Sequence, residues 1–128
     1  MTYVLDASAL LAALNGELGS VVVEGVLDRA VLCSVNLAEV VAALAARGNN
    51  HAQVRAIVVA LALDIVAADA ELAIDAGLLR TVTDRAGLSL GDRFCLATAR
   101  RLNAVALTAD RAWADIAIPA QVRVELIR

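Results

Sequence analysis

Four acidic residues stand at places where their carboxylates could act on one metal ion: Asp6, Glu39, Asp92 and Asp110. Two unit charges 4 Å apart repel by about 4 kcal/mol at an effective dielectric constant near 20. A divalent cation relieves such repulsion, and oxygen ligands without nearby His or Cys favour Mg²⁺ or Mn²⁺ over zinc. Such an ion activates water and stabilises charge on a phosphoryl group, which predicts phosphodiester hydrolysis.

Three of these acids also have an ordinary structural explanation. Asp6 can cap the helix predicted after it, and Asp110 can cap a short helix that follows it. Asp92 stands three residues after Ser89, the spacing of a capping box. Taken singly, none of the three is convincing, and the prediction depends on all of them meeting at one place.

Glu39 is harder to explain as an ordinary residue. It is the only charge between Arg29 and Arg47, in an apolar segment that is predicted to be helical. Burying a lone carboxylate is costly, so on such a helix it needs a partner or a metal ion.

Short apolar runs alternate with helical segments along the chain. We expect Ser34 and Asp69 to cap the helices that follow them. Strands are predicted at 2–5, 30–33, 64–66, 104–107 and 122–126, the last at a sheet edge, and helices at 8–15, 20–28, 35–47, 52–63, 70–85 and from 89 or 91 to 103. This alternation predicts an α/β fold with a mainly parallel sheet between helical layers.

The predicted sheet brings the acids together. Asp6 and Asp110 each follow a strand, and Asp92 begins a helix near a strand end. Ligands of open parallel sheets bind beyond the carboxyl ends of the strands. We therefore expect the four acids to meet at this edge of the sheet.

Composition limits the remaining possibilities. The 128 residues fit one domain over 1–128, with 61% hydrophobic and 2% aromatic residues and a net charge of −3. If a metal ion engages four acids, ten remain against eleven arginines, so an acidic chain does not exclude a phosphate-bearing substrate. The mean hydropathy of +0.76 predicts an apolar patch that self-association or a partner covers.

The sequence also argues against several other classes of protein. Its longest uncharged run has ten residues, against roughly 20 for a membrane-spanning helix. Its first residues lack the basic region and apolar stretch of a signal peptide, so we expect a cytoplasmic protein without membrane contact. No glycine-rich phosphate-binding motif is present. We expect Cys33 and Cys95 to be buried free thiols and His51 to lie on the surface, which leaves no catalytic His for acyl transfer.

Three ordered motifs resemble those of PIN domains. VLDASAL at 4–10 is similar to the opening motif of the family, and SLGD at 89–92 followed by CLA at 95–97 resembles the central one. LTADRAW at 107–113 resembles the third motif, and Glu39 falls where the family has a helical glutamate. The resemblance covers the whole chain in order, and at this length it points to the VapC toxins.

This resemblance implies a three-layer α/β/α PIN fold and cleavage of single-stranded RNA with Mg²⁺ or Mn²⁺. It also implies a homodimer and inhibition by a cognate VapB-like antitoxin. The metal-binding acids would be Asp6, Glu39, Asp92 and Asp110, with Asp115 either a further carboxylate or an ordinary helix residue. Ser8 and Thr108 would be hydroxyls that orient the ligands or water.

Recognition of RNA is predicted to depend on arginines and on shape. Arg93 and Arg111 adjoin the acids and are candidates to hold RNA phosphates. Arg100 and Arg101 are either further candidates or part of a solvated helix face. Because the chain has one Trp, one Tyr and one Phe, base stacking cannot be its main means of recognising RNA.

Two alternatives to a VapC-like toxin stay open. One is a PIN nuclease that processes RNA without an antitoxin. The other is a non-catalytic PIN-like module that only binds a partner, against which the intact set of four acids argues. Metal binding would separate this module from a nuclease, and a small antitoxin-like reading frame beside the gene would separate the two nucleases.

Overall fold

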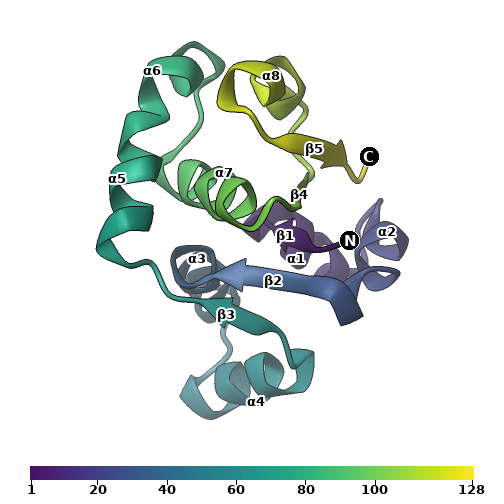
Figure 1. Cartoon of the computed structure of the whole chain (residues 1–128). Coiled ribbons are helices and arrows are strands. Elements are labelled where there is room, and N and C mark those ends of the chain that lie inside the picture. The colour runs from purple at the N-terminus through teal and green to yellow at the C-terminus, as the bar shows by residue number, and fades with distance from the viewer.

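A five-stranded, entirely parallel sheet lies at the centre of the computed structural model, which describes residues 1–128 (Figure 1). The strands are β1 (Tyr3–Leu5), β2 (Ala30–Cys33), β3 (Asp64–Val66), β4 (Val105–Thr108) and β5 (Arg123–Leu126). Their spatial order is β3-β2-β1-β4-β5, so β3 and β5 form the two edges. The mainly parallel sheet and the edge position of the last strand are confirmed.

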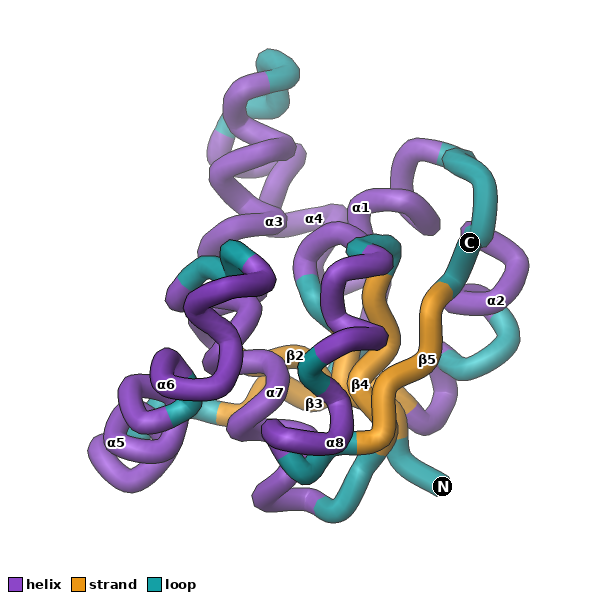
Figure 2. Tube along the Cα trace, turned by 90° about the horizontal axis from the view of Figure 1, so that it is seen from above, coloured by secondary structure: helices purple, strands orange, loops and turns teal.

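Helices lie on both sides of the sheet, as Figure 2 shows for the orange strands between purple helices. The α-helices are α1 (Ala7–Asn15), α2 (Ser20–Glu24), α3 (Ser34–Ala46), α4 (His51–Leu61), α5 (Ala70–Leu78), α6 (Arg80–Thr83), α7 (Leu90–Leu102) and α8 (Ala117–Ala120). Three 3₁₀ helices are η1 (Leu27–Arg29), η2 (Asp84–Ala86) and η3 (Arg111–Asp115). The predicted three-layer α/β/α arrangement is confirmed. None of the helices is long and apolar enough to cross a membrane.

The sheet separates two hydrophobic cores because successive side chains of a strand point to opposite faces. Val4 and Ala106 belong to the core that also contains residues of α5 and α7. Their neighbours Leu5 and Leu107 belong to the core that contains residues of α1 and α3. This alternation holds α7 on one face of the central strands and α1 on the other.

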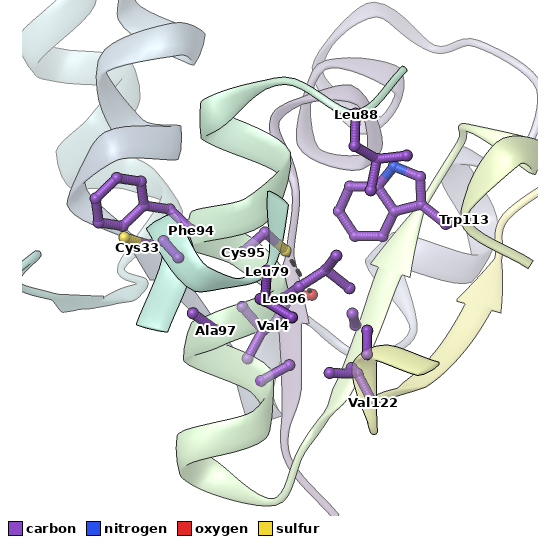
Figure 3. Packing of buried hydrophobic residues seen from close by; sticks show 14 of the residues in the cluster. Val4, Cys33, Leu79, Leu88, Phe94, Cys95, Leu96, Ala97, Trp113 and Val122 are labelled. Carbon is purple, nitrogen blue, oxygen red and sulfur yellow. Dashed lines mark hydrogen bonds between the residues drawn. The ribbon is translucent and has the colours of Figure 1, made fainter. Parts of the chain in front are cut away.

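The core beside α7 contains both cysteines, which are buried and free, as expected (Figure 3). The Sγ atom of Cys95 on α7 lies 3.9 Å from the carbonyl oxygen of Val4 on β1, the contact that the dashed line marks. Burial raises the pKa of the Cys95 thiol well above its ordinary value. Both thiols are therefore structural, and His51 is exposed at the start of α4, also as expected.

Two predicted helices are broken in the structure. The helix expected over 20–28 ends at Glu24 and is followed by η1, because Gly25, a poor helix former, comes directly after Glu24. The helix expected over 70–85 divides into α5, α6 and η2 before it closes at Gly87. Gly87 has a φ of 71°, a left-handed conformation that favours glycine.

The expected capping role of Ser34 is wrong. Helix α3 begins directly at the end of β2, so Cys33 occupies the cap position and Ser34 lies within the first turn. The Ser34 Oγ atom instead accepts a hydrogen bond of 3.0 Å from the backbone N–H of Ala68. The hydroxyl thereby fastens α3 to the segment that follows β3.

Asp69 caps α5 as predicted, and it also joins α5 to α7. Its Oδ1 atom accepts from the N–H of Leu72 at 2.8 Å, and both carboxylate oxygens accept from the Arg101 guanidinium at 2.9 and 3.0 Å. The hydrogen bonds from Arg101 and Leu72 lower the pKa of Asp69 to about 2. Arg101 is thus committed to an ion pair within the chain.

We expect Asp69→Ala to lower the Tm by a few degrees at pH 7, because it removes both a helix cap and an ion pair. Since folding lowers the pKa of Asp69, its contribution to stability is present above the ordinary pKa of 3.8 and is lost as the pH falls toward 2. Thermal unfolding of both proteins between pH 2 and 7 measures this difference. A difference in Tm that stays constant over this range would contradict the assignment.

Candidate active site

Two of the predicted acids follow strands at the place where the strand order reverses. β1 has β2 on one side and β4 on the other, and the crevice beyond such strands is the usual ligand site of open parallel sheets. Asp6 directly follows β1, and Asp110 stands two residues after the end of β4. The N–H of Asp6 donates to the carbonyl oxygen of Leu107 at 3.1 Å, which joins the two strand ends.

The Asp6 carboxylate is buried and accepts hydrogen bonds from several donors. Its side chain is only 3% exposed. Its Oδ1 atom accepts from the N–H of Ala9 at 2.8 Å, so Asp6 does cap α1, and from Ser8 Oγ at 2.7 Å. Its Oδ2 atom accepts from Thr108 Oγ1 at 2.7 Å. Both hydroxyls predicted to orient ligands therefore contact Asp6.

The same two hydroxyls continue from Asp6 to the segment after β4. Ser8 Oγ accepts from the N–H of Ala109 at 3.1 Å, and Thr108 Oγ1 accepts from the N–H of Asp110 at 3.0 Å. Because each hydroxyl both donates and accepts, the position of Asp110 is tied to that of Asp6. Asp110 also caps η3, since one of its oxygens accepts from the N–H of Ala112 at 3.0 Å.

Asp92 lies at the start of α7 and forms the capping box considered from the sequence. The N–H of Ser89 donates to Asp92 Oδ2 at 2.9 Å, and the N–H of Asp92 donates to Ser89 Oγ at 3.1 Å. This box engages one of the two carboxylate oxygens. A capping role and a metal-binding role are therefore compatible for Asp92.

Glu39 projects from α3 toward the first turn of α7. Its side chain is exposed, whereas the sequence suggested a carboxylate in apolar surroundings. Its Oε1 atom accepts from Asn36 Nδ2 at 2.9 Å, and its carboxylate lies so close to Gly91 that a Cβ atom there would overlap it. Because Gly91 is the residue before Asp92, the Glu39 carboxylate lies next to the start of α7, where Asp92 stands.

Charge and burial couple three of the four acids. Burial raises the pKa of Asp6 to about 6 against the lowering effect of its hydrogen bonds, and the negative charge of Asp92 adds to the increase. Although Glu39 as a whole is exposed, partial desolvation of its carboxylate raises its pKa; the hydrogen bond from Asn36 lowers the pKa, and the charge of Asp92 raises it. Asp6, Glu39 and Asp92 thus form one electrostatically unfavourable group, to which Thr108 connects Asp110.

This group suits a hydrated Mg²⁺ or Mn²⁺ ion by its chemistry. No three His, Cys, Asp or Glu side chains converge into a complete metal-binding cluster. Mg²⁺, however, usually keeps several waters and takes one or two carboxylates together with substrate phosphates. The donors here are all oxygens, and their mutual repulsion is of the kind that a cation removes.

The arginines near the site are placed differently from one another. Arg93 is half-buried and donates to the carbonyl oxygen of Ala76 at 3.3 Å, so it packs α7 against α5. Arg111 is exposed at the start of η3, directly after Asp110. Arg100 donates to the carbonyl oxygen of Ala120 at 3.4 Å. Arg111 is therefore the arginine that stays beside the acids with an exposed side chain.

Asp115 is not linked to the four acids. It is exposed at the end of η3, and its charge does not contribute to the altered pKa of Asp6 or Glu39. One further residue, Asn36, contacts the site and was not predicted. Its signal in the sequence was present, because a lone polar side chain three positions before Glu39 lies on the same side of a helix.

The comparisons with known proteins agree with this fold. The profile of the PIN domain matches residues 3–119. No curated protein matches the chain as a sequence relative. Among solved structures, the fold is similar to VapBC2 from Rickettsia felis bound to a promoter DNA fragment, with 21% identity, 98% coverage of both chains and a TM-score of 0.75.

Two further complexes contain the same fold. DNA-bound VapBC from Salmonella typhimurium is 20% identical; the likeness covers 100% of this chain and 99% of that chain, with a TM-score of 0.70. A toxin–antitoxin complex from Klebsiella pneumoniae is 19% identical; the likeness covers 99% of this chain and 98% of that chain, with a TM-score of 0.73. Such identities establish a shared fold, while the profile match extends over most of the sequence and includes Asp6, Glu39, Asp92 and Asp110. The chain therefore belongs to the PIN domain family.

Proposed function

We propose that this chain is a Mg²⁺- or Mn²⁺-dependent endoribonuclease and the toxin of a VapBC-type toxin–antitoxin pair. The observation that carries the proposal is the buried Asp6 carboxylate, held by Ser8 and Thr108 and raised in pKa beside the charge of Asp92. The negative charge of Asp92 disfavours the ionised form of Asp6, and a bound cation would offset this repulsion. The membership of the PIN domain family supports nuclease chemistry at this site.

The residues that would hold the metal ion are Asp6, Asp92, Glu39 and Asp110. When bound, the ion supplies activation of water and charge stabilisation at the phosphodiester. Ser8 and Thr108 donate to Asp6 and so fix the direction of its oxygens, which is how supporting hydrogen bonds tune metal sites. Asp92 is fixed by its bond with the Ser89 N–H, and this rigid placement favours a defined position of the attacking water.

Single-stranded RNA is the proposed substrate. Arg111 lies beside Asp110 with an exposed guanidinium, which suits a contact with a phosphate. Arg93 is a weaker candidate because it donates to Ala76 on α5. With only three aromatic residues in the chain, we expect RNA shape rather than base stacking to set the specificity.

A VapB-like antitoxin and a second copy of the chain are the proposed partners, in the cytoplasm. The similar solved structures are VapBC and toxin–antitoxin complexes, and the likeness covers the chain almost completely. Several large apolar side chains are exposed, among them Leu18 at 79%, Leu78 at 64% and Ile118 at 89%. Exposed apolar surface of this kind is typical of proteins that act in complexes.

We expect the purified protein to cleave single-stranded RNA in the presence of Mn²⁺ and to lose this activity in EDTA. Single-stranded DNA of the same sequence serves as the control and should stay intact. Gel analysis of end-labelled strands measures both reactions. Cleavage that persists in EDTA would contradict a metal-dependent site, and the absence of both cleavage and Mn²⁺ binding in calorimetry would favour a non-catalytic binding module.

A further inference from the structure

Asn36 joins two helices at the edge of the candidate active site. Its side chain is buried, with 1% exposure, on α3. A single nitrogen, Nδ2, donates to Glu39 Oε1 at 2.9 Å and to the carbonyl oxygen of Gly91 at 3.0 Å. Glu39 belongs to α3 and Gly91 to α7, so one amide group sets the position of the Glu39 carboxylate relative to the first turn of α7.

Gly91 provides the space that this arrangement needs. A Cβ atom at this position would overlap the Glu39 carboxylate. The backbone of Gly91 is an ordinary part of α7, so its missing side chain is required by this close approach rather than by a special backbone conformation. Asn36 and Gly91 therefore act on the same carboxylate from two sides.

Burial of the Asn36 amide has a cost in stability at its oxygen atom. The Oδ1 atom of Asn36 is buried and has no hydrogen-bond donor. A buried polar atom without a partner destabilises a protein, and an apolar side chain of similar size would avoid this. A requirement for the N–H groups of the amide explains why a polar residue occupies this buried position.

The Glu39 carboxylate needs a hydrogen-bond donor because the negative charge of Asp92 repels it. The side chain of Glu39 is also long and exposed. Without a donor nearby, the carboxylate would turn toward solvent and away from the other acids. The hydrogen bond from Asn36 opposes this movement and leaves the Oε2 atom without a donor from the protein.

We propose that Asn36 is a positioning residue that holds Glu39 against Gly91, so that Glu39 faces a divalent cation shared with Asp92. This inference rests on the proposed metal-dependent function. It adds a residue outside the four acids and assigns a reason to the glycine before Asp92. The side chain acts through Glu39 and does not itself contact the cation or the RNA.

The test measures the Kd of Mn²⁺ by calorimetry on the full chain, with urea unfolding in EDTA as a separate measure of the fold. We expect Asn36→Leu to weaken Mn²⁺ binding about tenfold or more, the range seen when groups that orient metal ligands are removed, and to leave metal-free stability unchanged or higher. Asn49→Leu is the matched control. Asn49 also donates an amide hydrogen bond to a backbone carbonyl of α3, that of Leu44, but lies away from the acids.

A double-mutant cycle with Glu39→Gln separates positioning from a general structural effect. If Asn36 acts through Glu39, adding Asn36→Leu to Glu39→Gln weakens Mn²⁺ binding no further. Gly91→Ala should weaken binding in the same way while keeping α7 helical, and it provides the test if Asn36→Leu fails to fold.

Two outcomes overturn the inference and can be told apart. If the wild type binds Mn²⁺ and Glu39→Gln weakens this binding, but Asn36→Leu and Gly91→Ala do not, the positioning role is wrong and the metal site stands. If the wild type itself binds no Mn²⁺, the proposed function fails together with the inference.

Discussion

An Asp92→Asn variant is expected to fold like the wild type and to cleave RNA on the order of 10³-fold more slowly. The variant would keep the α7 cap, because the amide oxygen of the new side chain can accept from the Ser89 N–H as the carboxylate does. What the variant loses is the negative charge that also acts on Asp6 and Glu39. The loss of several kcal/mol of cation binding and charge stabilisation accounts for the size of the effect.

Asp69→Asn is the matched control for this variant. Asp69 also stabilises a helix start, since it is the N-cap of α5 and accepts from the N–H of Leu72, but its carboxylate binds Arg101 and takes no part in the site. RNA cleavage with Mn²⁺ should be unchanged in this control, while its Tm falls slightly. Comparable cleavage by Asp92→Asn and the wild type would show that these acids do not carry the activity.

In EDTA, the wild type should lose about 2 to 3 kcal/mol of stability relative to Asp6→Asn as the pH rises from 4 to 7. Folding raises the pKa of Asp6 from 3.8 to about 6, mainly through burial. Between these two pKa values the folded protein therefore keeps a proton on Asp6 that the unfolded chain has already released. The stabilising effect of the protonated form is complete below pH 3.8 and disappears as the pH rises through about 6.

Mn²⁺ should reverse this loss above pH 6, since the cation binds the deprotonated carboxylates and stabilises only the folded state. Urea unfolding at several pH values, with EDTA or with Mn²⁺, measures both effects. Asp6→Asn should show neither the loss in EDTA nor the full gain with Mn²⁺. Parallel stability curves for the two proteins would mean that Asp6 titrates normally and that the carboxylate is not confined as described.

Local patterns predicted much of the fold. Strands β2 and β3 have the bounds expected from the sequence, because each contains a short apolar run with helix signals on either side. The caps at Asp69 and Ser89 were also predicted, since a capping side chain bonds to a backbone N–H only three residues away. Two helices that were expected to continue end earlier, at Glu24 and at Leu78.

The sequence by itself determined which residues stand at the carboxyl ends of β1 and β4, because position along a strand or helix is a local property. Only the tertiary structure decided how Glu39 meets the other acids. Asn36 and Gly91 are 55 positions apart, and their contact depends on how α3 packs against α7. The hydrogen bond from Arg93 to the carbonyl oxygen of Ala76 likewise depends on how α7 packs against α5. Periodicity shows which face of a helix is apolar, but the partner of that face depends on the packing of the whole chain.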